Sequence, residues 1–257
     1  MSTNQRDYRE WHQGTDSCCE NYDEKLFQPG RYDYEVWLKE QRLLEGIVER
    51  FVPHGERYLD FACGTGRVLA HLESRFPESI GLDISESMLA TARGRVKGAR
   101  LICADATREP EAVPGPFDCI TAFRFFLNAQ PDLRDEAMAL LASKLRDELS
   151  VLVFNVHGNS RSSRWLAART TRFRDRTYNE LSRAAVVRLI QRHGLELVEW
   201  HGLQYLDAGL YKWLPSRLCA GIERALDPLE FLKSCAVNLY FVCRRAQPGP
   251  RVAPSDG

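Results

Sequence analysis

The segment that decides the fold runs from Tyr58 to Arg67 and reads YLDFACGTGR. Its first half is a short apolar run typical of a buried strand. Its second half carries Gly64 and Gly66, where the backbone can turn sharply and a ligand can approach it closely. The segment therefore predicts a strand, a tight turn and the start of a helix.

Apolar runs and helical periodicity alternate around this segment. Thr177 and Glu180 form a T-x-x-E pattern typical of a capping box, which would begin a helix. Gly194 lies at the position expected for the end of the same helix. Strands separated by helices predict an α/β fold, a Rossmann-like, doubly wound and mostly parallel seven-stranded sheet with helices on both faces. We expect strands at 57–62, 78–83, 99–104, 117–123, 149–156, 195–203 and 236–244, and helices at 34–51, 66–75, 85–95, 132–146 and 178–193.

The length of 257 residues fits one substantial domain. We expect an N-terminal lid and helix over 1–52, the main domain over 53–245 and a disordered, Pro- and Gly-rich tail over 246–257. Residues 157–177 and 204–235 are longer than simple connections. They are expected to be inserts after the fifth and sixth strands, which in such folds are usually lids or binding elements.

The composition is that of an ordinary soluble protein. The chain has 35 basic and 35 acidic side chains, so its formal net charge is zero and nucleic acid is not an expected partner. The polar N-terminus and the lack of a run of eighteen apolar residues predict neither secretion nor a membrane span, and hence a cytoplasmic protein. The spacing of the eight cysteines predicts no metal site. We expect reduced core thiols at Cys63, Cys103, Cys119, Cys235 and Cys243.

The ends of the predicted strands carry further informative residues. Asp60 lies in the first strand, and Asp83 and Asp105 end the second and third. An open parallel sheet binds ligands at these carboxyl ends. Glycines and an acid at the second strand would also suit a dinucleotide. The third glycine of the dinucleotide fingerprint, however, is replaced by Leu69, and that fingerprint does not require an acid such as Asp105.

With these residues the chain resembles the class I S-adenosylmethionine-dependent methyltransferase family, of the small-molecule type. The glycine motif of that family is matched by Asp60-x-Ala62-x-Gly64-x-Gly66, its ribose acid by Asp83 and its adenine acid by Asp105. The resemblance covers residues 57–203 and the last strand, and implies S-adenosyl-L-methionine as the cofactor. The cofactor-binding residues that we expect are Asp60, Phe61, Gly64, Thr65, Gly66, Asp83, Ile84, Met88, Asp105, Ala106 and Phe123, with the lid residues Tyr22 and Tyr34.

Two residues are candidates on the acceptor side. His157 directly follows the fifth strand and could act as a general base, although a surface histidine at a strand end is an equal alternative. Arg124, at the exit of the fourth strand, could hold a carboxylate or phosphate. Asn128, Asn155 and Asn159 could orient an acceptor. Six arginines between 161 and 176 form either a solvated face or a positive lid that attracts an anionic acceptor.

Taken together, the sequence predicts an enzyme that transfers a methyl group from S-adenosylmethionine to an oxygen or nitrogen of a small, anionic or sugar-containing metabolite. One alternative is an NAD(P)-dependent oxidoreductase, which Leu69 and Asp105 disfavour. The other is a non-catalytic S-adenosylmethionine-binding protein. A monomer or homodimer without a membrane partner is expected.

Overall fold

The protein is described by a computed structural model that covers residues 8–9, 27–157, 161–163 and 181–247. The predictions for Tyr22, Asn159, the capping box and most of the arginine-rich insert lie outside these residues, as does the tail from residue 248. The strands are β1 (Arg57–Phe61), β2 (Glu78–Asp83), β3 (Arg100–Cys103), β4 (Cys119–Ala122), β5 (Val151–His157), β6 (Leu195–Leu203) and β7 (Asn238–Arg245). The helices are α3 (Tyr32–Phe51), α4 (Arg67–Leu72), α5 (Glu86–Arg93), α6 (Pro131–Lys144), α8 (Arg183–Arg192), α9 (Leu210–Trp213) and α10 (Ser216–Leu226), with short 3₁₀ turns at Glu73–Arg75, Pro110–Ala112 and Glu230–Cys235.

All seven strands form one sheet in the order β3-β2-β1-β4-β5-β7-β6. The first five strands run parallel to one another, and β7 runs antiparallel to both of its neighbours, β5 and β6. The predicted Rossmann-like, mostly parallel sheet is therefore confirmed. The strand order reverses between β1 and β4, the place where such sheets bind ligands.

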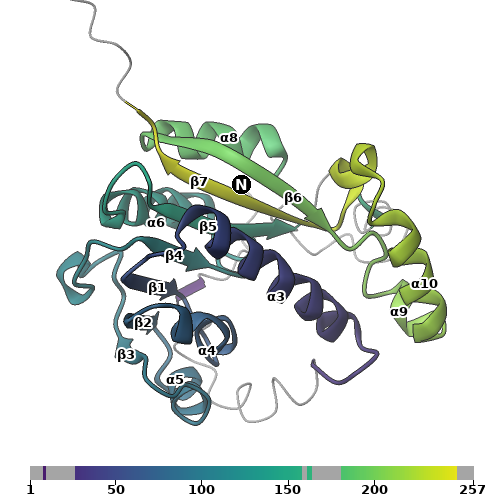
Figure 1. The fold of residues 1–257 in the computed structure, drawn as a ribbon, viewed down its shortest axis with the longest axis horizontal. Helices are drawn as coiled ribbons and strands as arrows, with labels where there is room; N and C mark the ends of the chain where they lie inside the picture. The colour runs from purple at the N-terminus through teal and green to yellow at the C-terminus, as the bar shows by residue number, and fades with distance from the viewer. Residues whose placement is uncertain (1–7, 10–26, 158–160, 164–180, 248–257) are drawn as a thin grey trace, which may run out of the picture.

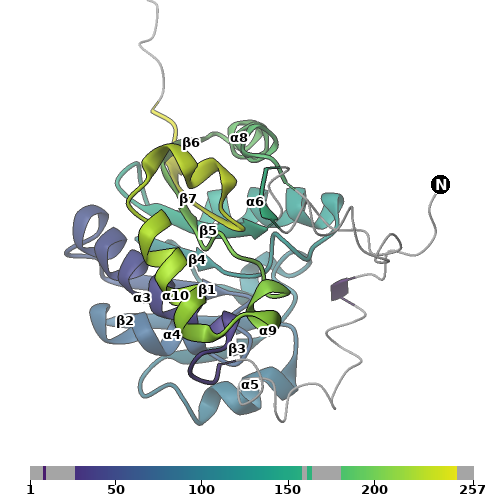
Figure 2. The same ribbon diagram turned by 90° about the vertical axis from the view of Figure 1, so that its right-hand side faces the viewer.

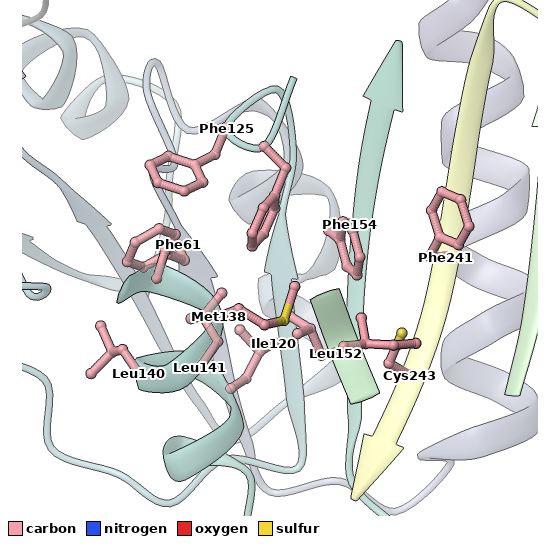
Figure 3. Close-up of a cluster of buried hydrophobic side chains, with 14 of the residues drawn as sticks. Phe61, Ile120, Phe125, Met138, Leu140, Leu141, Leu152, Phe154, Phe241 and Cys243 are labelled. Carbon is pink, nitrogen blue, oxygen red and sulfur yellow. The ribbon is translucent and has the colours of Figure 1, made fainter. Parts of the chain in front are cut away.

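Helices cover both faces of the sheet. In Figure 1, α3 crosses in front of the strands while α6 and α8 lie behind them, and Figure 2 shows the same layers edge-on. Neighbouring residues of a strand face opposite sides, so Tyr58 packs with α3 and α4 whereas Leu59 packs in the core under α6 and α8. Figure 3 shows the core between the sheet and helices α6 and α8, in which the rings of Phe154 and Phe241 stack with centroids 5.6 Å apart.

The start of α8 differs from the prediction. The helix begins at Arg183 and not at 178, because Ser182 has an extended backbone and its hydroxyl accepts the Ala185 N–H at 3.2 Å. Ser182 is therefore the N-cap of α8, and the predicted helix start at 178 was wrong, while Thr177 and Glu180 lie outside the described residues.

The segment 204–235 is helical and lies beyond the carboxyl ends of the strands, where α9 and α10 face the viewer in Figure 2. Ion pairs join it to α3, since the Lys39 ammonium lies 2.9 Å from the Glu223 carboxylate and 2.8 Å from that of Asp227. The start of α3 also touches α9, through an edge-to-face contact between Tyr32 and Tyr211. Within the described residues, no helix combines the length and the apolar character that a membrane crossing requires.

The cysteine prediction was right for Cys119 and Cys243, which are buried, and wrong for Cys103, which is exposed. Cys103 ends β3, and β3 is an edge strand with one neighbour only. Cys63 and Cys235 are partly buried. All five have free thiols.

The sheet lets α4 approach closely at Gly81 in β2. A Cβ atom on Gly81 would lie 2.5 Å from Leu69 Cδ2 and 2.8 Å from Leu101 Cδ2. Leu69 itself is fully buried. The close helix–strand contact that a third glycine provides in dinucleotide folds is thus provided here by a glycine on the strand, with the leucine on the helix.

Gly81→Ala tests this contact. We expect the substitution to lower the free energy of unfolding by about 1–3 kcal/mol, because the added methyl group overpacks the interface between α4 and the sheet. Urea unfolding followed by circular dichroism measures the change.

Gly221→Ala is the matched control. Gly221 lies in α10, and a Cβ atom there would meet nothing within 4 Å. This variant should be more stable by roughly 0.5–1 kcal/mol, because alanine favours a helix. Equal stability of Gly81→Ala and the native chain would contradict the close packing described above.

Candidate functional site

The candidate site lies at the carboxyl ends of β1, β2 and β4. One cavity there is lined by six residues of the predicted cofactor set, namely Asp60, Gly64, Thr65, Asp83, Met88 and Phe123. Arg124 and Asn128, predicted on the acceptor side, line the same cavity. The fold therefore brings together side chains from positions 60 to 128, as the parallel sheet predicts.

The glycine loop turns through left-handed backbone at every second residue. Ala62, Gly64 and Gly66 have φ angles of 55°, 55° and 74°. A Cβ atom on Gly64 would meet nothing within 4 Å, so the space beside it is open to a ligand. A Cβ atom on Gly66 would lie 2.9 Å from Ala92 Cβ, and Gly66 is absent from the cavity lining. Gly66 therefore serves the packing of α4 against α5, and its φ angle also requires glycine.

Asp83 fastens this loop to the neighbouring strand. Its Oδ2 accepts the Gly64 N–H at 2.7 Å, and its Oδ1 accepts the Ser85 N–H at 2.9 Å. The N-cap of α5 is Ser85, whose hydroxyl accepts the Met88 N–H at 3.4 Å. Asp83 is therefore not a helix cap, and its carboxylate faces the cavity.

Asp60 is buried beneath the loop. Its Oδ1 accepts the Thr121 hydroxyl at 2.7 Å, and the Tyr58 hydroxyl lies 2.6 Å from Thr121 Oγ1. Among the described residues no donor hydrogen-bonds to Asp60 Oδ2. Burial raises the pKa of Asp60 to about 7, against the opposing effects of the Thr121 hydrogen bond and the nearby Arg67 charge.

A second cavity adjoins the first and contains the remaining predicted strand-end residues. Phe61, Ile84, Asp105 and Ala106 line it, and Asp83 lines both cavities. Asp105 Oδ1 accepts the Thr107 hydroxyl at 2.5 Å and the Thr107 N–H at 3.1 Å. Its Oδ2 accepts Arg9 Nε–H at 2.8 Å.

Arg124, predicted on the acceptor side, lines the first cavity. Its backbone is left-handed, with φ at 61°, and its N–H donates to Asn155 Oδ1 at 2.7 Å. Its guanidinium lies 2.9 Å from the Asp33 carboxylate at the start of α3. Asn155 is buried, so it holds the backbone of Arg124 and does not reach into the cavity.

Two predicted residues lie elsewhere. Tyr34 lines a separate cavity with Phe27, Trp37 and Arg67, on the side of α4 that faces α3. His157 ends β5 as expected and is partly exposed, but it does not line either of the two adjoining cavities.

Several residues of the site were not predicted from the sequence. Cys63 and Arg67 line the first cavity, and Tyr8 and Arg9 line the second, which also includes Thr107 and Leu133. Cys63 and Arg67 flank the glycines in the sequence, so the loop itself signals them. No local pattern singles out Tyr8 and Arg9, because they reach the site only through the tertiary fold.

The comparisons with known proteins agree with this geometry. The profile of a family described as a methyltransferase domain matches residues 59–148. The demethylmenaquinone methyltransferase of Thermotoga maritima is 30% identical over 206 residues, which are 76% of this chain and 80% of that protein. The chain belongs to the class I S-adenosylmethionine-dependent methyltransferase family. The methyltransferase therefore uses S-adenosylmethionine, and the nicotinamide alternative is excluded.

Two further likenesses are narrower. The dTDP-3-amino-3,4,6-trideoxy-alpha-D-glucopyranose N,N-dimethyltransferase of Streptomyces venezuelae is 42% identical over 77 residues, 30% of this chain and 31% of that protein. The magnesium protoporphyrin IX methyltransferase of Synechocystis PCC 6803 with bound SAH superimposes with a TM-score of 0.61 at 12% identity, over 90% of this chain and 97% of that one. The latter likeness supports the fold alone.

The raised pKa of Asp60 predicts how the stability of this methyltransferase depends on pH. The folded state binds the Asp60 proton more tightly than the unfolded state, whose carboxyl has a pKa near 4. The stability that this group contributes is thus fully present below about pH 4 and is lost as the pH rises through about 7. Urea unfolding between pH 5 and 8 should show this fall, and Asp60→Asn should flatten it.

Glu148→Gln is the control, since it removes an exposed carboxylate far from the loop. It should keep the native slope of stability against pH. The same slope in Asp60→Asn would show that another group titrates.

Proposed function

We propose that the methyltransferase transfers a methyl group from S-adenosylmethionine to an oxygen or nitrogen of a small acceptor that carries a negative charge. The observation that carries this proposal is the position of Arg124. Arg124 lines the same cavity as Asp60 and Gly64 and does not line the second cavity. An anionic group held there would lie beside the cofactor-binding loop.

The cavity residues fit the cofactor. Asp83, which holds the Gly64 and Ser85 N–H groups and lines both cavities, would accept hydrogen bonds from the ribose hydroxyls. Asp105 would accept from the adenine amino group, with Ile84 beside the ring. Asp60 Oδ2, a buried acceptor without a donor among the described residues, suits the positively charged methionine end. When bound, the cofactor supplies an activated methyl group on its sulfonium.

The chain's own residues then have to align the acceptor and accept a proton from it. Asn155 fixes the Arg124 backbone, and the Arg124 guanidinium is paired with Asp33, so an anionic acceptor would bind the guanidinium in competition with that carboxylate. We assign the proton to the His157 imidazole, which ends the strand next to β4 and lines neither cavity, so the acceptor would have to extend beyond the first cavity to reach it. Asn128, whose amide donates to the Arg124 carbonyl at 2.8 Å, supports the same edge.

The relatives support a small acceptor. The Streptomyces venezuelae relative is named for a dTDP-linked amino sugar, whose diphosphate is anionic, and the Thermotoga maritima relative for demethylmenaquinone, which is neutral. Comparing the two compounds as acceptors therefore tests whether this enzyme prefers a charged or an uncharged acceptor.

Two substitutions at one ion pair test the role of Arg124. With a dTDP-linked amino sugar as acceptor, Arg124→Ala should raise KM roughly 10- to 100-fold, because a charged hydrogen bond to the acceptor is lost. Asp33→Asn should lower KM, because it removes the carboxylate that competes for the guanidinium. Transfer of labelled methyl groups measures both variants.

Binding of S-adenosylhomocysteine should be unchanged in both variants, since neither residue is assigned to the cofactor. The proposal of an anionic acceptor fails if demethylmenaquinol is methylated in preference to the amino sugar, or if Arg124→Ala methylates both as well as the native enzyme does.

His157→Ala tests the proton acceptor. We expect kcat to fall about 100-fold with unchanged affinity for S-adenosylhomocysteine, because a general base contributes on that order to turnover. His201→Ala is the control, since His201 lies on β6 and its Nε2 is 2.8 Å from Glu199. If His157→Ala turns over like the control, methyl transfer depends on alignment alone.

A further inference from the structure

Arg9 fastens the N-terminal part of the chain to the second cavity. Its Nε donates to Asp105 Oδ2 at 2.8 Å, and its Nη2 donates to Thr107 Oγ1 at 2.7 Å and to Glu136 Oε2 at 2.5 Å. The side chain of Arg9 is only 14% exposed. One guanidinium thus joins the loop after β3 to helix α6, across 96 and 127 positions of sequence. Residues 8 and 9 are the short isolated purple segment in Figures 1 and 2.

These contacts fix the state of the Asp105 carboxylate. Burial alone would raise the pKa of Asp105, but the Thr107 hydrogen bonds and the Arg9 charge outweigh it and lower that pKa. Thr107 holds Oδ1 and Arg9 holds Oδ2, so the carboxylate has one orientation. Held in this way, it can only accept hydrogen bonds from a ligand.

Tyr8 lies where the two cavities meet. Like Ala62 and Asp83, it lines both of them. Its ring packs edge-to-face on Phe125 with centroids 5.3 Å apart, and its N–H donates to Gln130 Oε1 at 3.2 Å. Tyr8 therefore lies along the wall that the two cavities share, between the Gly64 loop and the Asp105 carboxylate, and Arg9 lines the second cavity beside it.

We propose that Arg9 is a positioning residue for the adenine end of the cofactor, which holds Asp105 as an ionised acceptor for the 6-amino group, and that Tyr8 forms part of the wall along the adenosine. The proposal rests on the assignment of Asp105 to adenine made above. Its consequence is base selectivity. A purine with an oxo group at position 6 presents an acceptor there in place of the amino donor, so it faces the Asp105 carboxylate with an oxygen and loses the hydrogen bond at that position.

Arg108 is a second arginine near Asp105, but it does not hydrogen-bond to that carboxylate. Its Nε lies 3.7 Å from the same Asp105 oxygen, beyond hydrogen-bond distance, and its side chain is 69% exposed. It contributes a screened charge without fixing the carboxylate. Arg108 is therefore the matched control for Arg9, because it lies near Asp105 without holding its carboxylate.

Calorimetric titration of the full chain with S-adenosylhomocysteine and with its 6-oxo analogue, S-inosylhomocysteine, tests the proposal. The native protein should prefer the adenine compound. Arg9→Ala should weaken binding of S-adenosylhomocysteine roughly 5- to 50-fold and should reduce that preference, because the Asp105 carboxylate loses the hydrogen bond that fixes the orientation of its Oδ2. Arg9→Lys should recover part of the preference, and Arg108→Ala should keep all of it.

Three results would overturn the role of Arg9. Unchanged affinity in Arg9→Ala removes it from the site, and tighter binding makes it an obstacle to the cofactor. An equal loss for both nucleosides, with the preference kept, makes it a packing residue only. Failure of the native protein to bind S-adenosylhomocysteine would instead overturn the cofactor assignment of the cavity, so the two failures are distinguishable without any acceptor.

Discussion

The rest of the site depends on one carboxylate, that of Asp83, which accepts backbone N–H groups from two different turns. It holds Gly64 of the loop after β1 at 2.7 Å and Ser85 before α5 at 2.9 Å. In this loop Cys63 N–H donates to the Leu82 carbonyl and Gly66 N–H to the Cys63 carbonyl, and the Asp83 side chain satisfies the Gly64 N–H between them. Because Asp83 lines both cavities, the group that orders the loop also faces the ligand. With Asp83 on the ribose as proposed, cofactor binding and loop geometry would be linked through the same oxygen atoms.

A second buried acid ties the loop to the N-terminal helix. Glu40 of α3 is fully buried, and it accepts the Tyr240 hydroxyl of β7 at 2.8 Å and Arg67 Nη1–H at 3.1 Å. Arg67 begins α4 directly after the glycine loop, and its guanidinium lies 4.2 Å from the centroid of the Trp37 ring. A buried carboxylate is tolerated only when it is paired in this way. Helix α3 is thus fixed against the loop, and it presents Asp33 to Arg124 from a rigid element.

The sequence predicted the strands and the acids at their ends, because buried parallel strands are apolar runs and their carboxyl ends converge on one edge. Asp60, Asp83 and Asp105 follow directly from this rule. The sequence could not predict the contact between Arg9 and Asp105, because an arginine in a polar N-terminal stretch has no periodicity or spacing that marks a partner 96 positions away. The start of α8 was missed for a different reason. Ser182 and the pair Thr177 and Glu180 are both good capping signals, and local propensity cannot choose between them.

Backbone strain is concentrated where the two ligands would meet. Two non-glycine residues of the first cavity, Ala62 and Arg124, have left-handed backbone, which costs on the order of 1–2 kcal/mol for each. Ala62 is held by the loop that Asp83 fastens, and Arg124 by the Asn155 carboxamide. The core beneath them, in which the Phe61 ring packs on Phe125 and the Phe126 ring on Phe154, leaves little freedom to relax. The fold therefore holds the glycine loop and the Arg124 backbone rigidly, as the proposed alignment of cofactor and acceptor would require. For a transfer in which the cofactor carries the activation, alignment of this kind is the main contribution that the protein can make.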